Sequence, residues 1–327
     1  MKRILRYGLL AGSVVLVIAT FEMLHRELSG VSGYRIALEF RGLSSTDLGL
    51  AALLTTASYA VLAGYELLAF INAGVALSRW RIVLTSFLGY AVSNTVGFSV
   101  LSGAAVRYRF YARWQITARQ ISGIVAFYAG TFWLGLMVIG GWGLWQTSVP
   151  LVSNAAGVNW TKALGAGIFL MSSLYLLASI VWRHPTIRGR TYDLPGWRIA
   201  SAQYVLSILD WTLSSSVLWV LLPDPKPAFS QVSVAFVVAQ LVGVASHLPG
   251  GIGAFEAIIV AQLDQAVPME GLLLAMVAFR GIYYLGPFAA AMGIIAADEC
   301  RQWWGRGGGR HLESSQPRRD SRVFNMR

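Results

Sequence analysis

The chain has 327 residues, of which 56% are hydrophobic and only 13% are charged, and its mean hydropathy is +0.58. Since about 25% of the residues in a typical soluble domain are charged, this composition excludes an ordinary soluble protein and predicts a membrane protein. The net charge of +11 would suit nucleic-acid binding in a soluble chain, but in a membrane protein the anionic cytoplasmic leaflet explains it. A single cysteine, Cys300, and four scattered histidines exclude an internal disulfide and predict neither a metal site nor another cofactor.

Six apolar stretches are long enough to cross the hydrocarbon core of a bilayer, which requires roughly 20 residues. They are 7–24, 50–73, 121–146, 162–182, 199–222 and 272–297. The first follows a basic start, as in a signal peptide, but it has no convincing small-residue cleavage site, so we expect a retained span. The chain is therefore predicted to be an all-α polytopic membrane protein with about six full spans.

Two further apolar regions, 82–106 and 229–267, contain residues that interrupt helices. The first has Ser93, Asn94, Gly97, Ser102 and Gly103, and the second has Ser246, His247, Pro249, Gly250, Gly251 and Gly253. Each region either crosses the membrane or turns back within it, and loop charge decides between these alternatives because cytoplasmic loops are rich in Arg and Lys.

The first region is followed by a basic loop with Arg107, Arg109, Arg113 and Arg119. If the N-terminus is cytoplasmic, a full crossing by 82–106 would place these four arginines outside without any acidic residue among them. We therefore predict two re-entrant hairpins that enter from opposite faces of the bacterial inner membrane, with both termini in the cytoplasm.

Weak internal similarity relates the two halves of the chain. The matching pieces are Ser-Asn-x-x-Gly at 93–97 and Ser-His-x-x-Gly at 246–250, Val-Ala-Phe at 125–127 and 277–279, and Leu-Gly at 134–135 and 285–286. Each match can arise by chance in an apolar sequence, but the order is the same in both halves. Together with the opposed hairpins, this predicts repeat units at about 50–146 and 199–297 in inverted orientation, the plan of many transporters.

The end of the chain differs in composition from the rest. An integral membrane domain is expected over 1–299, and the Gly- and Arg-rich segment 300–327 is predicted to be a basic, disordered cytoplasmic tail. Contact of this tail with the lipid surface is favoured over binding to nucleic acid.

Four ionisable residues stand out within the predicted apolar segments, where a charge at the centre of a span costs on the order of 2.5 to 3.5 kcal/mol. They are Glu66, Asp210, Glu256 and Arg280. One interpretation is a polar cavity in which Asp210 or Glu256 pairs with Arg280. The alternative is a buried ion pair that only holds helices together.

The hairpin residues and the arginines after them are the other candidates for a binding path. Backbone that is not helical is tolerated at membrane depth where it is buried in protein or lines a wet cavity, so both sets of interrupting residues are predicted to line a path. The alternative is a kinked helix packed against its neighbours. Arg107 and Arg109 have the fork geometry to hold a lipid phosphate, and ordinary anchoring at the cytoplasmic face is the alternative.

The two hairpin sequences resemble those of the lysylphosphatidylglycerol synthase transmembrane-region family. They read Ser-Asn-x-x-Gly-x-x-x-Leu-Ser-Gly-x-Ala-Val-Arg-Tyr-Arg over 93–109 and Ser-His-Leu-Pro-Gly-Gly-Ile-Gly-x-Phe-Glu over 246–256. The resemblance extends over nearly the whole chain as far as Ala297. In the two-part members, the membrane portion is implied to flip aminoacylated phosphatidylglycerol, which a separate soluble domain makes. Too few residues follow the last span for such a domain, so the resemblance implies a flippase-like role without lipid aminoacylation or tRNA binding.

The expected function is movement of a phospholipid or lipid-like substrate between leaflets. The sequence has no P-loop, nucleophile elbow or HExxH motif, so we expect neither an ATP-driven transporter nor an enzyme. One alternative is an intramembrane enzyme that modifies a lipid head group, for which His247 and Glu256 are the candidate pair. Another is a non-transporting partner of an envelope lipid enzyme.

Overall fold

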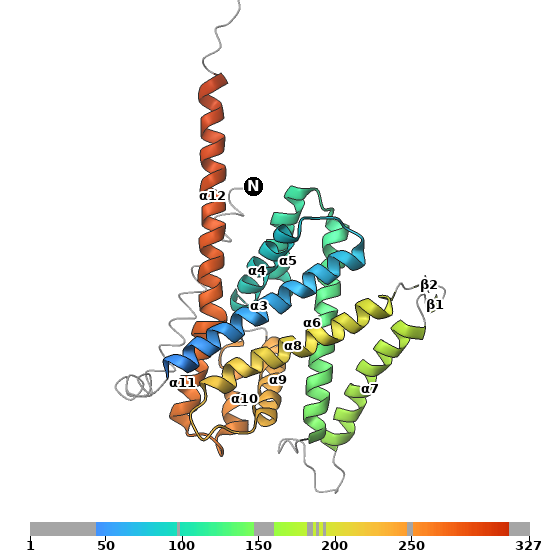
Figure 1. Ribbon diagram of the computed structural model, residues 1–327, viewed down its shortest axis with the longest axis vertical. Coiled ribbons are helices and arrows are strands. Elements are labelled where there is room, and N and C mark those ends of the chain that lie inside the picture. Colours follow the sequence, from blue (N-terminus) through green and yellow to red (C-terminus); the bar gives the residue numbers. More distant parts are fainter. Residues whose placement is uncertain are drawn as a thin grey trace, which may run out of the picture.

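The computed structural model describes residues 44–96, 99–146, 160–181, 186–187, 190–191, 194–246 and 251–313. The long helices are α3 (Ser45–Ala73), α6 (Ala118–Gln146), α7 (Trp160–Val181), α8 (Trp197–Leu221) and α12 (Gly286–Glu313). The shorter helices are α4 (Arg79–Val96), α5 (Ser99–Tyr111), η1 (Ala112–Trp114), α9 (Phe229–Ala245), α10 (Ala254–Leu263), α11 (Met269–Phe279) and the π-helical segment η4 (Arg280–Leu285). A minimal antiparallel ribbon pairs β1 (Thr186–Ile187) with β2 (Arg190–Thr191), with Thr186 opposite Thr191. Apart from this ribbon, the regular elements of the described residues are helices, and the predicted all-α class is confirmed (Figure 1).

Five helical segments are long and apolar enough to cross a membrane. They are Ser45–Ala73, Ala118–Gln146, Lys162–Val181, Trp197–Leu221 and Met269–Trp303, the last running through α11, η4 and α12. These segments confirm five of the six predicted spans. The other predicted span, 7–24, lies outside the described residues. The two shorter apolar helices, α9 and α10, fall within the second interrupted region.

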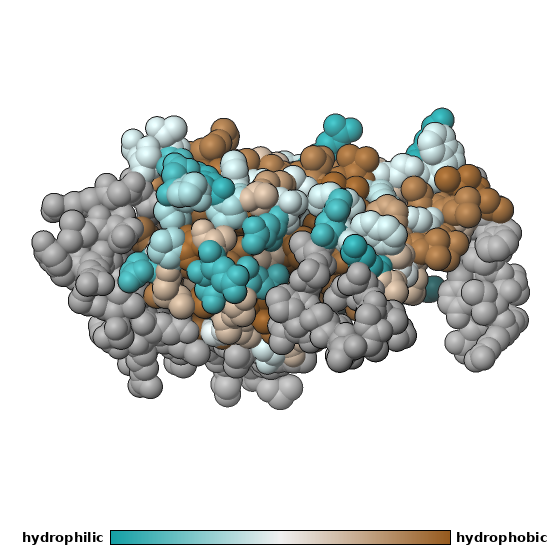
Figure 2. Space-filling model, turned by 90° about the horizontal axis from the view of Figure 1, so that it is seen from below, coloured by the Kyte–Doolittle hydropathy of each residue, from teal (hydrophilic) through white to brown (hydrophobic). Residues whose placement is uncertain are grey.

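The outer surface of α7 shows how the bundle meets its surroundings. Its exposed side chains are almost all large and apolar: Leu164, Phe169, Leu170, Met171, Leu174, Leu177, Ile180 and Val181. In Figure 2 hydrophobic residues gather toward the right of the molecule, among some polar ones, on the side where α7 lies in Figure 1. An apolar surface of this kind is stable against lipid tails and not against water, so the protein is a polytopic membrane protein.

Glycines bring α6 and α7 into close contact. A Cβ atom on Gly165 would lie 2.6 Å from the carbonyl oxygen of Gly141, and one on Gly141 would lie 2.9 Å from the Phe169 backbone nitrogen. Small residues at such crossings let two backbones approach, which is how helices gain packing energy in lipid. The outermost span is thereby held to the rest of the bundle.

Each interrupted region forms a pair of short helices. In the first pair, α4 and α5 are separated only by 97–98, and a Cβ atom on Gly103 would lie 3.2 Å from the Cβ of Ser93. In the second pair, Phe236 of α9 and Phe255 of α10 have ring centroids 5.6 Å apart. The chain therefore folds back on itself in both regions.

Four residues predicted to interrupt the first region are helical. Ser93 and Asn94 lie in the last turns of α4, and Ser102 and Gly103 lie in α5, in contrast to the non-helical backbone predicted for them. Ser93 donates a hydrogen bond to the Tyr90 carbonyl oxygen at 3.2 Å, and the neighbouring Thr95 bonds that of Ala91 in the same way. Polar side chains that bond to the preceding turn are compatible with a helix in an apolar setting. The non-helical segment is therefore shorter than the sequence predicted.

The two helix pairs open toward opposite ends of the molecule (Figure 1). Helices α3 and α8 are antiparallel, since Ser58 contacts Ser214 whereas Gly64, further along α3, lies against Leu206, earlier in α8. The pair α4–α5 follows the C-terminal end of α3, and the pair α9–α10 follows the C-terminal end of α8. The order of long helix, short pair and long helix thus occurs twice along the chain, and the first long helices of the two sets are antiparallel.

Helix α12 continues into the segment predicted to be a disordered tail. It ends at Glu313, so 300–313 is helical, and the rest of that segment lies outside the described residues. Gln302 donates to Asp298 one turn earlier at 2.8 Å, and Asp298 also accepts from Arg113 at 2.7 Å. These contacts within α12 and to η1 stabilise the helix beyond the apolar segment. The Gly- and Arg-rich composition did not indicate this extension.

Candidate functional site

Five charged side chains are buried between the helices of the described bundle. They are Glu66, Arg107, Asp210, Glu256 and Arg280. Four of them form two ion pairs, one at each helix pair, and Asp210 lies between these with hydroxyl partners only. Since an unpaired charge at membrane depth is costly, each of the three centres has to be explained.

The first ion pair joins α3 to the pair α4–α5. The Nε atom of Arg107 lies 2.9 Å from both carboxylate oxygens of Glu66, and its Nη2 atom lies 2.7 Å from Oε2. The Tyr111 hydroxyl also donates to Glu66, at 2.6 Å. Both charged side chains are 0% exposed, so the pair has the short, multiply bonded geometry that a buried charge requires.

Aromatic rings and glycines complete the surroundings of Arg107. The guanidinium carbon lies 4.6 Å from the ring centre of Tyr90 and 4.2 Å from that of Tyr128, in cation–π contact with both. A Cβ atom on Gly89 would lie 2.6 Å from Nη1 of Arg107, and one on Gly103 would lie 2.9 Å from it. These two glycines make room for the guanidinium, which the structure places inside the bundle rather than at the cytoplasmic interface where the sequence predicted it.

The next arginines of this segment contact α12. Arg109 forms an ion pair with Glu299, and Arg113 forms one with Asp298, with 2.7 Å between Nη1 and Oδ2. The Arg113 guanidinium also lies 5.0 Å from the ring centre of Phe110. The charged groups of these pairs are about one-third exposed or less, so Arg109 and Arg113 link the first helix pair to the last helix near the surface.

Asp210, on α8, is bonded to hydroxyl groups from α3. Ser58 donates to its Oδ1 atom at 3.2 Å, and Tyr65 donates to its Oδ2 atom at 3.1 Å. The Ser58 oxygen also lies 2.9 Å from the Tyr283 hydroxyl and 3.3 Å from that of Ser214, which is 2.8 Å from Tyr283. In the part of the chain that the structure describes, no cationic group pairs with Asp210.

This hydroxyl network extends toward the first helix pair. The Tyr59 hydroxyl donates to the Tyr283 carbonyl oxygen at 3.3 Å, and it interacts with the side chain of Asn94, in the last turn of α4. Asn94 is half-buried. The network therefore joins α3, α4, α8 and η4, and it includes Asn94 and Asp210 among the residues predicted to line a path.

The second ion pair joins the pair α9–α10 to the last span. The Nε atom of Arg280 donates to Oε1 of Glu256 at 2.6 Å, which realises one of the two partners predicted for Arg280. The Gly253 backbone N–H donates to Oε2 of Glu256 at 2.8 Å, so the same carboxylate caps the N-terminus of α10. Arg280 begins the π-helical segment η4, which also carries Tyr283.

Glycine is required at the start of the second helix pair. Gly251 has a φ of +64° and Gly253 one of +80°, a backbone region that strongly favours glycine. A Cβ atom on Gly251 would lie 2.9 Å from the Cα of Gly243 in α9. The remaining predicted hairpin residues, Gly97, His247, Pro249 and Gly250, lie outside the described residues.

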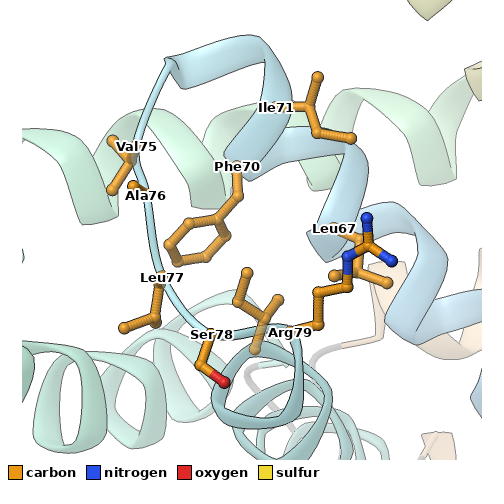
Figure 3. A pocket seen from close by; sticks show the side chains of 9 residues that line it. Leu67, Phe70, Ile71, Val75, Ala76, Leu77, Ser78 and Arg79 are labelled. Atoms are coloured by element: carbon orange, nitrogen blue, oxygen red, sulfur yellow. The ribbon is translucent and has the colours of Figure 1, made fainter.

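A cavity of about 450 Å³ lies elsewhere, between the end of α3 and the start of α4 (Figure 3). Its wall is mainly apolar, and the Arg79 side chain extends along one side of it. The lining residues are Leu67, Phe70, Ile71, Val75, Ala76, Leu77, Ser78, Arg79 and Ile82. None of the predicted path-lining residues is among them, so this cavity is separate from the three buried centres.

Sequence reasoning missed the hydroxyl and tyrosine partners of the buried charges. Ser58 and Tyr65 are seven residues apart on α3, as a single helix face requires, and Ser214 follows Asp210 by one turn of α8. Scanning for hydroxyl residues at helical spacing around each buried carboxylate would have found them. Tyr111 and Tyr283 gave no such signal, because they reach their partners from other elements.

Comparison with known proteins identifies related chains. A family described as the lysylphosphatidylglycerol synthase TM region matches residues 5–291. The chain is 30% identical to the uncharacterized protein slr0712 of Synechocystis over 295 residues, which are 88% of this chain and 90% of that one. It is 31% identical to the inner membrane protein YbhN of Escherichia coli over 244 residues, covering 73% and 76% of the two chains.

A more distant similarity relates the chain to phosphatidylglycerol lysyltransferase of Staphylococcus aureus. The two are 24% identical over 314 residues, which are 93% of this chain but only 35% of the lysyltransferase. The similarity therefore covers one part of a much longer protein.

Proposed function

This chain belongs to the lysylphosphatidylglycerol synthase transmembrane-region family, and we propose that it moves a phospholipid or lipid-like molecule between the leaflets of a bacterial inner membrane. The observation that carries the proposal is the set of buried polar groups from both halves of the bundle. On α3, Glu66 pairs with Arg107, and the adjacent Tyr65 donates to Asp210. On η4, Arg280 pairs with Glu256, and Tyr283 belongs to the hydroxyl network of Asp210. A polar interior of this extent serves a molecule whose head group must pass through lipid.

The relatives support the class of substrate and the location. The lysyltransferase is named for phosphatidylglycerol, and the Escherichia coli relative is named as an inner membrane protein. Because this chain matches only 35% of the lysyltransferase, we carry over the lipid class and not the transferase activity.

We further propose that α4–α5 and α9–α10 are re-entrant and belong to inverted repeats. Their opposite openings and the antiparallel α3 and α8 support this arrangement. Exposed arginines gather where α4–α5 opens: Arg79, Arg81, Arg113 and Arg119. By the positive-inside rule this end faces the cytoplasm, and both termini are placed there as well.

In this proposal the buried arginines receive the lipid phosphate by exchange. The guanidinium fork binds a carboxylate and a phosphate with the same two-bond geometry, so a phosphate can replace Glu66 at Arg107 or Glu256 at Arg280. Asn94 and Asp210 lie between these positions along the path of the head group, and Arg109 marks its cytoplasmic end. The acyl chains stay in the surrounding lipid, against apolar surfaces such as that of α7.

The test is movement of labelled lipid in vesicles that contain the purified protein. A fluorescent phosphatidylglycerol is incorporated into both leaflets, and an impermeant reductant then bleaches only the label that reaches the outer leaflet. Wild-type protein should expose the inner label, and Arg280→Gln should slow this exposure by about 10- to 100-fold, since a hydrogen bond to a charged group contributes about 1.5 to 3 kcal/mol.

Arg119→Gln is the matched control, because Arg119 is exposed at the surface and should leave the rate unchanged. The same vesicles are prepared with phosphatidylethanolamine and with an aminoacylated lipid to define the head group. The proposal of lipid movement is rejected if, for each of these lipids, the bleached fraction of label in vesicles with wild-type protein is no greater than in protein-free vesicles.

A further inference from the structure

Among the three buried carboxylates, Asp210 alone has no cation beside it in the described chain. The Asp210 side chain is buried, and its two hydrogen bonds come from the neutral hydroxyls of Ser58 and Tyr65. Glu66 and Glu256 each have an arginine. An ionised carboxylate without a cation is expensive at membrane depth, whereas a protonated one is far less so, which makes Asp210 the group whose charge can change.

The described side chains that bond to Asp210 are neutral hydroxyls. The titratable side chains that interact electrostatically with it are tyrosines: Tyr59 and Tyr65 from α3, Tyr90 from α4 and Tyr283 from η4. On α8 itself its polar neighbour is the Ser214 hydroxyl, within the Ser58–Tyr283 network. On α5, Arg107 is paired with Glu66. No cationic side chain among the described residues pairs with Asp210.

The spacing of the oxygen atoms suits a proton. The hydroxyls of Ser58, Ser214 and Tyr283 lie 2.8 to 3.3 Å apart and are hydrogen-bonded to one another. Each hydroxyl carries one rotatable hydrogen. When Asp210 is ionised, Ser58 donates to it; when Asp210 carries a proton, its own O–H donates to Ser58, which in turn donates to Tyr283 or Ser214. The same oxygen positions therefore satisfy both protonation states.

The network is also connected to both helix pairs. Tyr283 belongs to η4, and this π-helical segment begins with Arg280, whose partner Glu256 lies in the first turn of α10. On the other side, Tyr59 links Tyr283 to Asn94 at the end of α4. Single π-helical turns within α-helices occur frequently at functional sites. Tyr283 thus lies in the segment that joins the Asp210 network to the second helix pair.

We propose that Asp210 and its hydroxyl partners form a proton-binding site that couples lipid movement to the transmembrane proton gradient. The step is one reversible proton transfer: an O–H bond forms at Asp210 with a proton from one side of the membrane and breaks toward the other side. The proposal rests on the proposed lipid movement for its coupling, while proton binding at Asp210 can be measured independently of any lipid.

The first experiment measures proton binding directly. Infrared difference spectra between acidic and alkaline pH are recorded on the purified full-length protein in phosphatidylglycerol vesicles. We expect a carboxylic-acid C=O band that is absent from Asp210→Asn, returns in Asp210→Glu and persists in Asp264→Asn, where Asp264 is an exposed carboxylate at the end of α10. A wild-type spectrum that is unchanged in Asp210→Asn would overturn the assignment. Size-exclusion profiles matching the wild type establish that the variants are folded.

The second experiment measures coupling. A pH difference of one unit is imposed across vesicles with labelled phosphatidylglycerol, and the ratio of label in the two leaflets is followed. If one proton accompanies one lipid, the ratio should reach up to about tenfold, because one pH unit equals a tenfold concentration ratio. In Asp210→Asn, the ratio of label in the two leaflets should not respond to the pH difference. Asp264→Asn should behave as the wild type.

The outcomes separate the two proposals. Wild-type movement that ignores the pH difference, or follows a sodium gradient instead, overturns proton coupling and leaves lipid movement standing. Absence of movement for every lipid tested overturns the proposed function and the coupling together, and the infrared band then decides proton binding by itself.

Discussion

Removing Arg107 should destabilise the protein more than removing any other arginine of the first helix pair. In Arg107→Met, the Glu66 carboxylate would remain buried with only the Tyr111 hydroxyl as a donor, at 2.6 Å. Breaking a buried pair by removing one partner costs about 3 to 5 kcal/mol, because it leaves an uncompensated charge. The lost cation–π contacts to Tyr90 and Tyr128 add to this, so the upper part of that range is expected.

The double variant Glu66→Gln with Arg107→Met separates charge from packing. It removes both charges while the amide oxygen can still accept from Tyr111, and its free energy of unfolding should fall by only about 1 to 2 kcal/mol, since exchanging both members of a buried pair is often close to neutral. The double variant should therefore be more stable than Arg107→Met alone. This reversal is the signature of an ion pair and is not expected for simple loss of volume.

The assay is unfolding of the detergent-solubilised protein, followed by tryptophan fluorescence and by loss of the monodisperse peak. Arg113→Met is the matched control, because its pair with Asp298 is about one-third exposed and should contribute no more than about 1 kcal/mol. The reasoning is refuted if Arg107→Met destabilises no more than Arg113→Met, or if the double variant is less stable than the single one.

Two further predictions concern glycines and are checked by the same unfolding measurement. Gly251→Ala combines a positive φ with a Cβ atom 2.9 Å from the Cα of Gly243, and should cost about 1 to 3 kcal/mol, whereas Gly293→Ala, with open space around it on α12, should stabilise by up to about 1 kcal/mol. Gly165→Val should destabilise by about 1 to 3 kcal/mol or more, because its Cβ would meet the α6 backbone, and Gly167→Val, two residues away in open space, should change stability far less. Equal effects within either pair of variants would contradict the close approaches described here.

The sequence was sufficient to predict the long helices. Apolar stretches near the length of a bilayer leave few alternatives, since every backbone group in lipid must bond within its own helix. The predicted starts and ends of the spans at 50–73 and 199–222 differ from α3 and α8 by only a few residues. The breaks were predicted in the correct regions as well, because glycine and proline there oppose a continuous helix.

The site was harder to predict, because its contacts join residues far apart in the chain. Hydropathy identified Glu66, Asp210, Glu256 and Arg280 as unusual, but it could not show that Arg107 is the partner of Glu66. Arg107 belongs to a run of arginines that reads as a surface loop, and only the fold places it inside, beside Gly89 and Gly103. The hydroxyl partners of Asp210 were missed for the same reason, since they come from α3, α8 and η4.

The three buried carboxylates differ in the partners that hold them. Glu66 and Glu256 each meet an arginine within a helix pair, and Glu256 also caps α10, so these two centres fix the position of the helix pairs. All described partners of Asp210 are hydroxyls, and a neutral polar side chain at this position could bond to them equally well. A bundle selected for stability alone would gain by replacing it with a neutral residue, since the charge costs energy and contributes no ion pair. The presence of a carboxylate at this position is therefore best explained by a step in which its charge changes.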